Sequence, residues 1–314
     1  MKKTHSLKPN IFIRGKNRVV KQAREGLLFN IGALIAFAWA LSFLVVIIWG
    51  INISLMSPQE LETENAHYFT HTFSFINYIN AFDALKTEVS KDWYWLFPSG
   101  KGNYWFMLFN SLWFSLGSTI MKLISTICFA YVIARYRFPG RKFLYFFVII
   151  QMMLPTYGHV AANYKLLSGL GLVDSPLFLL AMGAGHGMYF LICHSYFESL
   201  PTAYEESARI DGSGYFRSFI QIMLPLAKPI IVCIGLLTFI SCWNDYTTTL
   251  LYLPHWRTLT SALFSYSEIT MHSSKGSIPV YFAGIIVSAI PILVLYIVFN
   301  KALMSNMTIG GIKG

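Results

Sequence analysis

The chain of 314 residues is 55% hydrophobic and 17% aromatic, and only 12% of its residues are charged. Since a soluble domain carries roughly 25% charged residues, this composition excludes an ordinary soluble globular protein. The formal net charge of +10 falls mostly in alternate connections between apolar segments and gives no reason to propose nucleic-acid binding.

Six apolar segments are each long enough to cross a bilayer, which takes about 20 residues of helix. Two of them contain a single charge, at about 105–134 around Lys122 and at about 230–253 around Asp245. We therefore expect an all-α integral membrane protein with six transmembrane helices. The other four segments contain no Asp, Glu, Lys or Arg and lie between Glu25 and Glu60, Lys142 and Lys165, Asp174 and Glu198, and Lys275 and Lys301.

In chain order, the sequence divides into a basic tail (1–26), a first transmembrane helix (27–52), an extracytoplasmic segment (53–104) and a core of five transmembrane helices (105–314). The extracytoplasmic segment contains an aromatic cluster, and aromatic side chains gather at membrane interfaces. We favour a position of this cluster at the membrane interface over its contact with a substrate or partner. The cluster consists of Trp93, Tyr94, Trp95 and Phe97.

The distribution of Lys and Arg predicts the orientation, because cytoplasmic loops are enriched in both. Seventeen of the 24 lie in the two tails and in the connections after the second and fourth spans. Six lie in the alternate connections, and Lys122 lies inside a span. Both termini are therefore expected in the cytoplasm. The first apolar run is longer than the roughly 7–15 residues of a signal peptide, so it is expected to be an anchoring helix.

The longest charged interruption of the second half, 198–225, lies on the cytoplasmic side by this count. Pro201 suits a first helical turn, and Gly212 accepts the positive φ that ends a helix. Ser213 is a suitable cap for a second helix that ends at Leu224, before Pro225. We expect two short amphipathic helices along the membrane surface, either a simple interfacial connection or a docking element for a soluble partner.

The spacing within this interruption, E-S-A-x3-G-x9-I-x-L-P, favours the docking element. It resembles the EAA signature of importer permeases of the ATP-binding cassette (ABC) family, with Ser207 in place of Ala. Neighbouring features, such as Trp243-Asn244-Asp245 and the terminal Ile312-Lys313-Gly314, are similar to the carbohydrate-uptake, MalG-like branch. The motif positions are Glu206, Ser207, Ala208, Gly212, Ile222, Leu224 and Pro225.

This resemblance implies that 198–225 is a coupling helix between spans four and five that docks on a cytoplasmic ABC ATPase dimer. It further implies a second related permease subunit, an extracytoplasmic solute-binding protein and a carbohydrate cargo, most simply an oligosaccharide, in a bacterial plasma membrane. The residues expected to dock on the ATPase are Glu205, Glu206, Ser207, Ala208, Arg209, Asp211, Gly212, Ile222, Leu224 and Pro225.

The chain contains no phosphate-binding G-x4-G-K-[ST] sequence. ATP and Mg are therefore expected on the partner ATPase subunits, and the chain itself is expected to bind no cofactor and to catalyse no covalent chemistry. The four cysteines lie in predicted spans at spacings that fit neither a zinc site nor a disulfide framework.

Polar side chains inside membrane spans are costly unless they face water or a partner, and they are the candidates for a substrate pathway. Lys122 either pairs with a carboxylate or lies against the partner subunit, and we favour such a structural role over contact with the ligand. Asn244 and Asp245 offer amide and carboxylate groups next to aromatic faces, an arrangement that suits carbohydrates. The candidate pathway residues are Asn110, Lys122, Trp243, Asn244, Asp245 and Tyr246.

Other classes of membrane protein remain as alternatives at this point. A permease of the same superfamily for a peptide or an amino acid would share the coupling motif. An integral-membrane enzyme requires converging acid, base or nucleophile side chains, and the sequence has only scattered His and carboxylates. A channel or secondary carrier more often contains repeats, broken helices or chains of intramembrane acids.

Overall fold

The computed structural model describes residues 10–62, 69–70, 73–88, 100–154, 158–183, 187–272 and 276–307. Within these ranges it leaves out the side chains of 10–28, 62, 87 and 299–307. The chain forms two compact units, Met1–Phe73 and Ser74–Gly314. The boundary between the units falls inside the predicted extracytoplasmic segment, and the aromatic cluster at 93–97 lies outside the described residues.

The first unit consists mainly of one long helix, α1 (Asn10–Leu55), followed by the short helix α2 (Pro58–Glu62). Its apolar part, Phe29–Leu55, is long enough to cross a membrane and agrees with the predicted first span. The end of α1 is tied to the following chain, because the Asn52 side-chain oxygen accepts a hydrogen bond from the Thr70 N–H at 2.8 Å. The Thr70 hydroxyl in turn donates to Glu60 at 2.8 Å.

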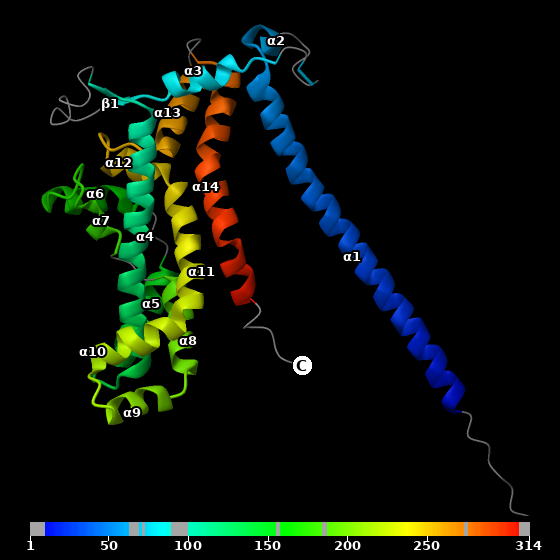
Figure 1. Ribbon diagram of the computed structural model, residues 1–314, viewed down its shortest axis with the longest axis vertical. Coiled ribbons are helices and arrows are strands. Elements are labelled where there is room, and N and C mark those ends of the chain that lie inside the picture. Colours follow the sequence, from blue (N-terminus) through cyan, green and yellow to red (C-terminus); the bar gives the residue numbers. More distant parts are fainter. Residues whose placement is uncertain are drawn as a thin grey trace, which may run out of the picture. The chain divides into compact units, whose positions relative to one another are not determined.

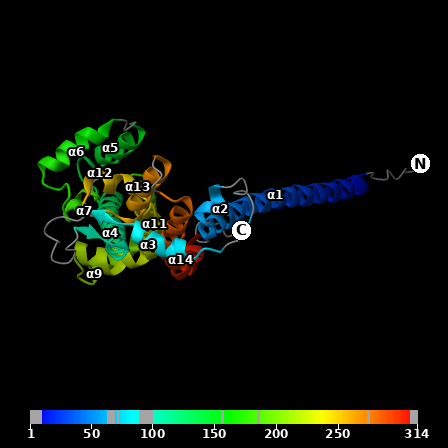
Figure 2. The ribbon, with the colours of Figure 1, turned by 90° about the horizontal axis from the view of Figure 1, so that it is seen from above.

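Three long helices dominate the second unit and run side by side (Figure 1). They are α4 (Tyr104–Arg135), α11 (Leu224–Trp243) and α14 (Ile278–Met307). Asn103 begins α4 by accepting the Phe106 N–H at 3.1 Å. Figure 2 shows α4 and α11 as neighbours in the middle of this unit. Among the described residues, the apolar stretches of spanning length here are Tyr104–Arg135, Tyr215–Trp243 and Ile278–Val298.

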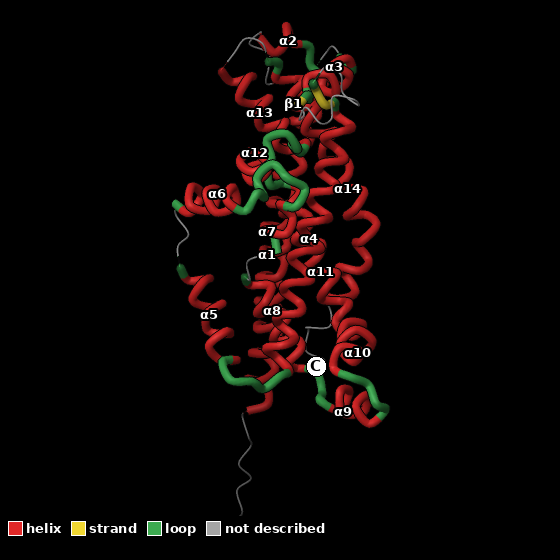
Figure 3. The backbone as a smooth tube through the Cα atoms, turned by 90° about the vertical axis from the view of Figure 1, so that its left-hand side faces the viewer, coloured by secondary structure: helices red, strands yellow, loops and turns green. Residues whose placement is uncertain are grey.

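The predicted third and fourth spans each contain two shorter helices. The third comprises α5 (Arg141–Met153) and α6 (His159–Gly169), and the fourth comprises α7 (Phe178–Ala181) and α8 (Met188–Ser199). α5 and α6 lie at different heights on the same side of the unit (Figure 3). None of these four helices reaches the roughly 20 residues of a full crossing, so the count of six spans stays a prediction.

Short elements occupy the two ends of the second unit. One end, called here the α3 end, carries α3 (Ile76–Ala84), α13 (Leu259–His272) and the antiparallel pair β1 (Thr87–Glu88) and β2 (Lys101–Gly102). The opposite end, the α9 end, carries α9 (Ala203–Ile210) and α10 (Tyr215–Ser218). The helix α12 (Tyr246–Tyr252) packs against α13.

The second surface helix does not end at Pro225 as the sequence predicted. Instead, α10 continues through a π-helical turn, η2 (Phe219–Met223), directly into α11. Proline has no N–H and clashes with the preceding turn of an α-helix, and a wider π turn is a common local accommodation within a helix. Pro225 therefore lies in the first turn of α11 and marks a change of helical register rather than a stop.

The helix of the predicted fifth span ends earlier than expected. α11 ends at Trp243, and Asp245 begins the separate helix α12. The Asp245 carboxylate accepts the Thr248 N–H at 2.9 Å and the Thr248 hydroxyl at 2.6 Å. A capping carboxylate of this kind satisfies the free N–H groups of a helix start. Asn244 and Asp245 thus lie at a helix break and not within a continuous span.

Replacing Gly276 by Ala should destabilise the second unit. A Cβ at this position would clash with the Cα and the Oγ1 of Thr270, so the backbone at Gly276 or at Thr270 must move. We expect a loss of about 1–3 kcal/mol, as for other overpacked sites, measured as a lower midpoint of thermal unfolding in detergent. Gly169→Ala, where nothing lies within 4 Å, is the control; equal midpoints for both variants would contradict this close approach.

Candidate functional site

The helix α9 ends in a tight, fully hydrogen-bonded turn. Gly212 has φ +75°, as its position in the sequence predicted. Its N–H donates to the Arg209 carbonyl at 3.0 Å, and the Ser213 N–H donates to the Ala208 carbonyl at 2.8 Å. This pair of bonds is a Schellman motif, which needs a residue that tolerates a left-handed conformation. The turn sets the angle between α9 and α10 and is a rigid feature of the α9 end.

One face of this helix–turn–helix is exposed and carries both charge and apolar surface. Glu206, Ser207, Arg209 and Asp211 are all exposed. The side chain of Ile210 is 86% exposed and that of Phe216 is 75% exposed. An aromatic and an aliphatic side chain this open, placed among charges, are typical of a surface that another protein covers.

Arg209 is held in place by an aromatic ring. Its guanidinium carbon lies 4.7 Å from the centroid of the Tyr215 ring, within the range of a cation–π contact. The contact joins α9 to α10 across the Schellman turn. It also leaves the guanidinium at the surface, where it can donate hydrogen bonds to an acidic group of a partner.

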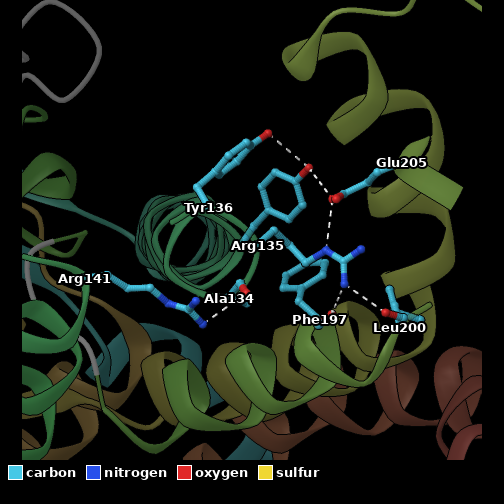
Figure 4. Close-up of polar contacts among 8 residues, drawn as sticks. Ala134, Arg135, Tyr136, Arg141, Phe197, Leu200 and Glu205 are labelled. Carbon is cyan, nitrogen blue, oxygen red and sulfur yellow. Dashed lines mark hydrogen bonds and ion pairs between the residues drawn. The ribbon is translucent and has the colours of Figure 1, made fainter. Parts of the chain in front are cut away.

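Glu205 is less exposed than its neighbour Glu206. Its Oε1 atom accepts hydrogen bonds from the Arg135 Nε at 3.0 Å and from the Tyr131 hydroxyl at 3.0 Å. The side chain of Glu205 is only 14% exposed and that of Arg135 only 5%. Figure 4 shows the carboxylate directed at the end of α4. Glu205, which the resemblance placed among the docking residues, is therefore an internal contact of this chain.

Arg135 binds the end of α8 with the same side chain. Its Nη1 atom donates to the Leu200 carbonyl at 2.9 Å and to the Phe197 carbonyl at 3.4 Å. The last carbonyls of a helix have no partner within it, so a buried cation there satisfies them. The Arg135 Nη2 atom has no acceptor among the described residues, which leaves Glu205 and the two carbonyls to compensate the burial of its charge.

Aromatic rings surround this ion pair. The Tyr131 ring stacks on Phe219 of η2 with 4.5 Å between centroids and meets Phe197 edge-on at 5.4 Å. Tyr136 meets Tyr131 edge-on at 5.6 Å and Tyr215 at 5.4 Å. These contacts exclude water from Arg135 and Glu205 and connect the π turn to α4.

The remaining motif positions lie at different depths. Ala208 is 4% exposed and faces inward, where a larger side chain would separate α9 from the unit. Ile222 and Leu224 are half-buried, and Pro225 is exposed. The predicted apolar face of the second helix is buried only at Phe219 and Met223, since the π turn rotates the helix relative to a regular one.

Two of the candidate pathway residues are fully buried in helix packing. The Asn110 side chain is 0% exposed, and its amide donates to the Arg257 carbonyl at 3.2 Å. The neighbouring Ser111 hydroxyl accepts the Leu259 N–H at 2.8 Å. Trp243 is buried against Phe239. Asn110 and Trp243 therefore stabilise the contact of α4 and α11 with the segment before α13.

The other four pathway candidates are more accessible. The Lys122 Nζ lies 3.6 Å from the Cys242 Sγ. The Asn244 amide donates to the Ile240 carbonyl of its own helix at 2.9 Å, and the Tyr246 ring stacks on Phe264 at 4.5 Å. Asp245 caps α12, as described above.

A cavity of about 600 Å³ lies between α6, α7 and α12. Its lining includes Asn163, Thr247, Thr248 and Tyr252, and it includes none of the six candidate pathway residues. The run of three threonines at 247–249 was the sequence signal closest to this cavity, but the sequence does not show that α6 and α7 face it.

The sequence did not predict a second polar pair, Asp174 and His255. The Asp174 carboxylate contacts the His255 ring Nδ1 and accepts the His255 N–H at 3.1 Å. The Asp174 N–H also donates to the Tyr252 carbonyl at 2.7 Å, and Asp174 has φ +56°. This pair joins the chain before α7 to the chain after α12. Among the described residues, no three His, Cys, Asp or Glu side chains gather as a metal site would require.

These features define the class as a helical membrane protein with a rigid, exposed helix–turn–helix at one end of its long apolar helices. The model of the family described as "Binding-protein-dependent transport system inner membrane component" matches residues 126–308. The chain belongs to this family.

Curated relatives and a solved structure agree with this membership. The maltodextrin transport system permease protein MdxG of Bacillus subtilis is 36% identical over 208 residues, 65% of this chain and 74% of that protein. The diacetylchitobiose uptake system permease protein NgcG of Streptomyces coelicolor is 26% identical over 280 residues, 87% of this chain and 85% of that protein. A bacterial ABC transporter involved in the import of the acidic polysaccharide alginate contains a chain of the same fold, with a TM-score of 0.65, 22% identity and coverage of 95% of this chain and 99% of that one.

Asp245→Ala should destabilise the protein, because it removes both acceptors for Thr248. Loss of a helix cap costs about 0.5–2 kcal/mol, which a lower midpoint of thermal unfolding would report. Asp245→Asn keeps one side-chain oxygen and should lose less, and Asn244→Ala is the control beside it. If Asp245→Ala unfolds at the wild-type temperature, the cap does not contribute to stability.

Proposed function

We propose that the protein is a translocating permease subunit of an ATP-driven importer for a carbohydrate, most simply an oligosaccharide. It works with a second related permease, with a cytoplasmic ATPase dimer that binds ATP and Mg, and with an extracytoplasmic solute-binding protein that delivers the cargo. Membership of the binding-protein-dependent family supports this assembly. The maltodextrin and diacetylchitobiose permeases among the relatives support the choice of cargo.

The observation that carries this proposal is the exposed face of α9 and α10. Glu206, Arg209 and Asp211 supply charge, and Ile210 and Phe216 supply open apolar surface, on a helix pair whose turn is fixed by Gly212. A rigid surface of this composition suits a protein partner better than lipid headgroups alone. The excess of Lys and Arg on this side of the chain supports a cytoplasmic α9 end, and it supports six spans with both termini inside.

In the proposed mechanism, ATP binding closes the two ATPase subunits and carries the docked α9 with them. Movement of α9 changes the packing of the spans and alternates the cavity between inward-facing and outward-facing states, a hinge-type switch. The chain contributes positioning and a passage rather than covalent chemistry. Of the candidate pathway residues, Lys122, Asn244, Asp245 and Tyr246 have accessible surface, and we propose them as contacts of the cargo.

Glu206→Lys should weaken the retention of the ATPase subunits, because it reverses a charge on the exposed face. Removing one partner of a hydrogen-bonded interface charge costs about 2–5 kcal/mol. The measurement is co-purification of the ATPase with the permease, together with uptake by reconstituted vesicles. Unchanged retention and uptake would remove α9 from the interface.

Gly212→Val should act through geometry rather than charge. Its φ of +75° costs an L-residue about 1–2 kcal/mol, so the Schellman turn should open and the angle of α9 should change. We expect reduced ATPase retention and uptake. Gly214→Val is a matched control two residues away, because Gly214 has φ −70° and no atom within 4 Å of a new Cβ. Equal losses in both variants would contradict a role for the turn.

The cargo class is tested by uptake in cells that carry the complete importer. Competition between a labelled malto-oligosaccharide and unlabelled saccharides, peptides and amino acids should show inhibition by saccharides alone. Inhibition only by peptides or amino acids would leave the permease assignment intact and overturn the carbohydrate cargo.

A further inference from the structure

We propose that Arg135, Glu205 and Tyr131 form a latch that joins α9 to α4, and that Glu205 is a positioning residue of the transport cycle. Its task is to transmit the movement of α9 to α4 and not to bind the ATPase. This inference rests on the proposed function, since it assigns separate roles to two adjacent acids of the docking segment.

Burial separates the two acids. Successive residues of an α-helix point about 100° apart, so two adjacent side chains can have different surroundings. Glu205 is 14% exposed and its Oε1 is engaged by both Arg135 and Tyr131. Glu206 is exposed. A partner protein can therefore reach Glu206 without disturbing α9, whereas contact with Glu205 would require the latch to open.

The chemistry of the latch makes it specific in position and direction. A buried carboxylate and a buried guanidinium are both costly unless they are paired and hydrogen-bonded. Here the carboxylate accepts two hydrogen bonds from α4. The guanidinium also donates hydrogen bonds to the carbonyls of Phe197 and Leu200 at the end of α8. Apolar packing would let α9 slide along the unit. The ion pair and the hydrogen bonds fix α9 to one point of α4, so a displacement of α9 is transmitted to α4.

The helix α4 connects the latch with the opposite end of the unit. The helix has 32 residues and is about 48 Å long at 1.5 Å per residue. Arg135 lies in its last turn, and the other end holds the segment before α13 through Asn110 and Ser111. The latch therefore lies at one end of a rigid helix whose other end contacts chain at the α3 end of the unit. The docking element and the segment before α13 are therefore connected through the single helix α4.

The π turn η2 is a point at which the chain can bend. The Phe219 ring of η2 stacks on Tyr131, the same residue that donates to Glu205. A π turn has weaker helical geometry than the α-helices on either side and is common at functional sites. Movement of α9 can therefore bend the chain at η2 while the ion pair keeps hold of α4.

The test uses the complete transporter, with its permeases and ATPase subunits in lipid nanodiscs for hydrolysis and in vesicles for uptake. The variants are Glu205→Gln, Tyr131→Phe, Glu205→Asp, which keeps the charge, and Glu206→Gln, which changes the exposed acid beside it. For each we measure ATPase retention, the rate of ATP hydrolysis with the solute-binding protein present, and cargo taken up per ATP hydrolysed. Thermal unfolding of each complex reports whether it is folded.

Glu205→Gln should retain the ATPase but lower the uptake per ATP by about fivefold or more, the lower range of a coupling effect between sites. Tyr131→Phe, which keeps the ring and the ion pair, should lower it less and remain folded. Glu205→Asp, which keeps the charge, should lose less of this ratio than Glu205→Gln. Glu206→Gln should show a different pattern, with weaker retention of the ATPase.

Three results would overturn the latch. An unchanged uptake per ATP in both Glu205→Gln and Tyr131→Phe would show that the bonds carry no motion. Loss of ATPase retention in Glu205→Gln, as in Glu206→Gln, would make Glu205 a docking residue. Parallel loss of uptake and hydrolysis, in proportion to folded protein, would reduce the latch to a stabilising contact. Failure of the proposed function looks different, because the wild-type chain would then neither retain an ATPase nor take up a saccharide.

Discussion

The burial of one guanidinium constrains the α9 end more than any other interaction described here. A charge removed from water must find acceptors nearby, and Arg135 has 5% of its side chain exposed. Its acceptors come from the end of α8 and from Glu205 of α9, two elements that follow each other closely in the chain. With those contacts in place, α9 has a fixed rotation about its own axis. That rotation decides which motif residues reach the surface, including Glu206, Arg209 and Ile210.

Irregular backbone in the second unit occurs at places where side chains or cavities accommodate it. In a bilayer, free backbone N–H and C=O groups are tolerated only where protein or water satisfies them. The break after Trp243 is satisfied by the Asp245 cap, and Thr247 and Thr248, just beyond it, line the cavity beside α6 and α7. The register change at η2 accommodates Pro225 and is covered by Tyr131. Each of these two breaks is thus covered or capped by neighbouring side chains.

Local sequence signals predicted the features that depend on neighbouring residues. The left-handed Gly212 and the helix start near Thr202 follow from short-range backbone preferences. The motif spacing, which rests on the same residues, indicated the family that the comparison then confirmed. The same signals were wrong about Pro225, because a proline that ends a helix and one that follows a π turn have the same sequence context. They were also wrong about the length of the fifth span, where hydropathy averages over the break at Asn244 and Asp245.

The sequence by itself determined the membrane class, the apolar helices of spanning length and the family motif, because composition, hydropathy and spacing are properties of short stretches of chain. Only the tertiary structure decided that Glu205 faces Arg135 while Glu206 faces outward, since the two acids are equivalent in sequence and their partner lies 70 residues away. It also decided that Asn110 holds the Arg257 carbonyl and that Asp174 meets His255. The physical reason is common to all three. A polar side chain can face several directions at similar local cost, and the choice depends on which distant group offers a hydrogen bond where water is excluded.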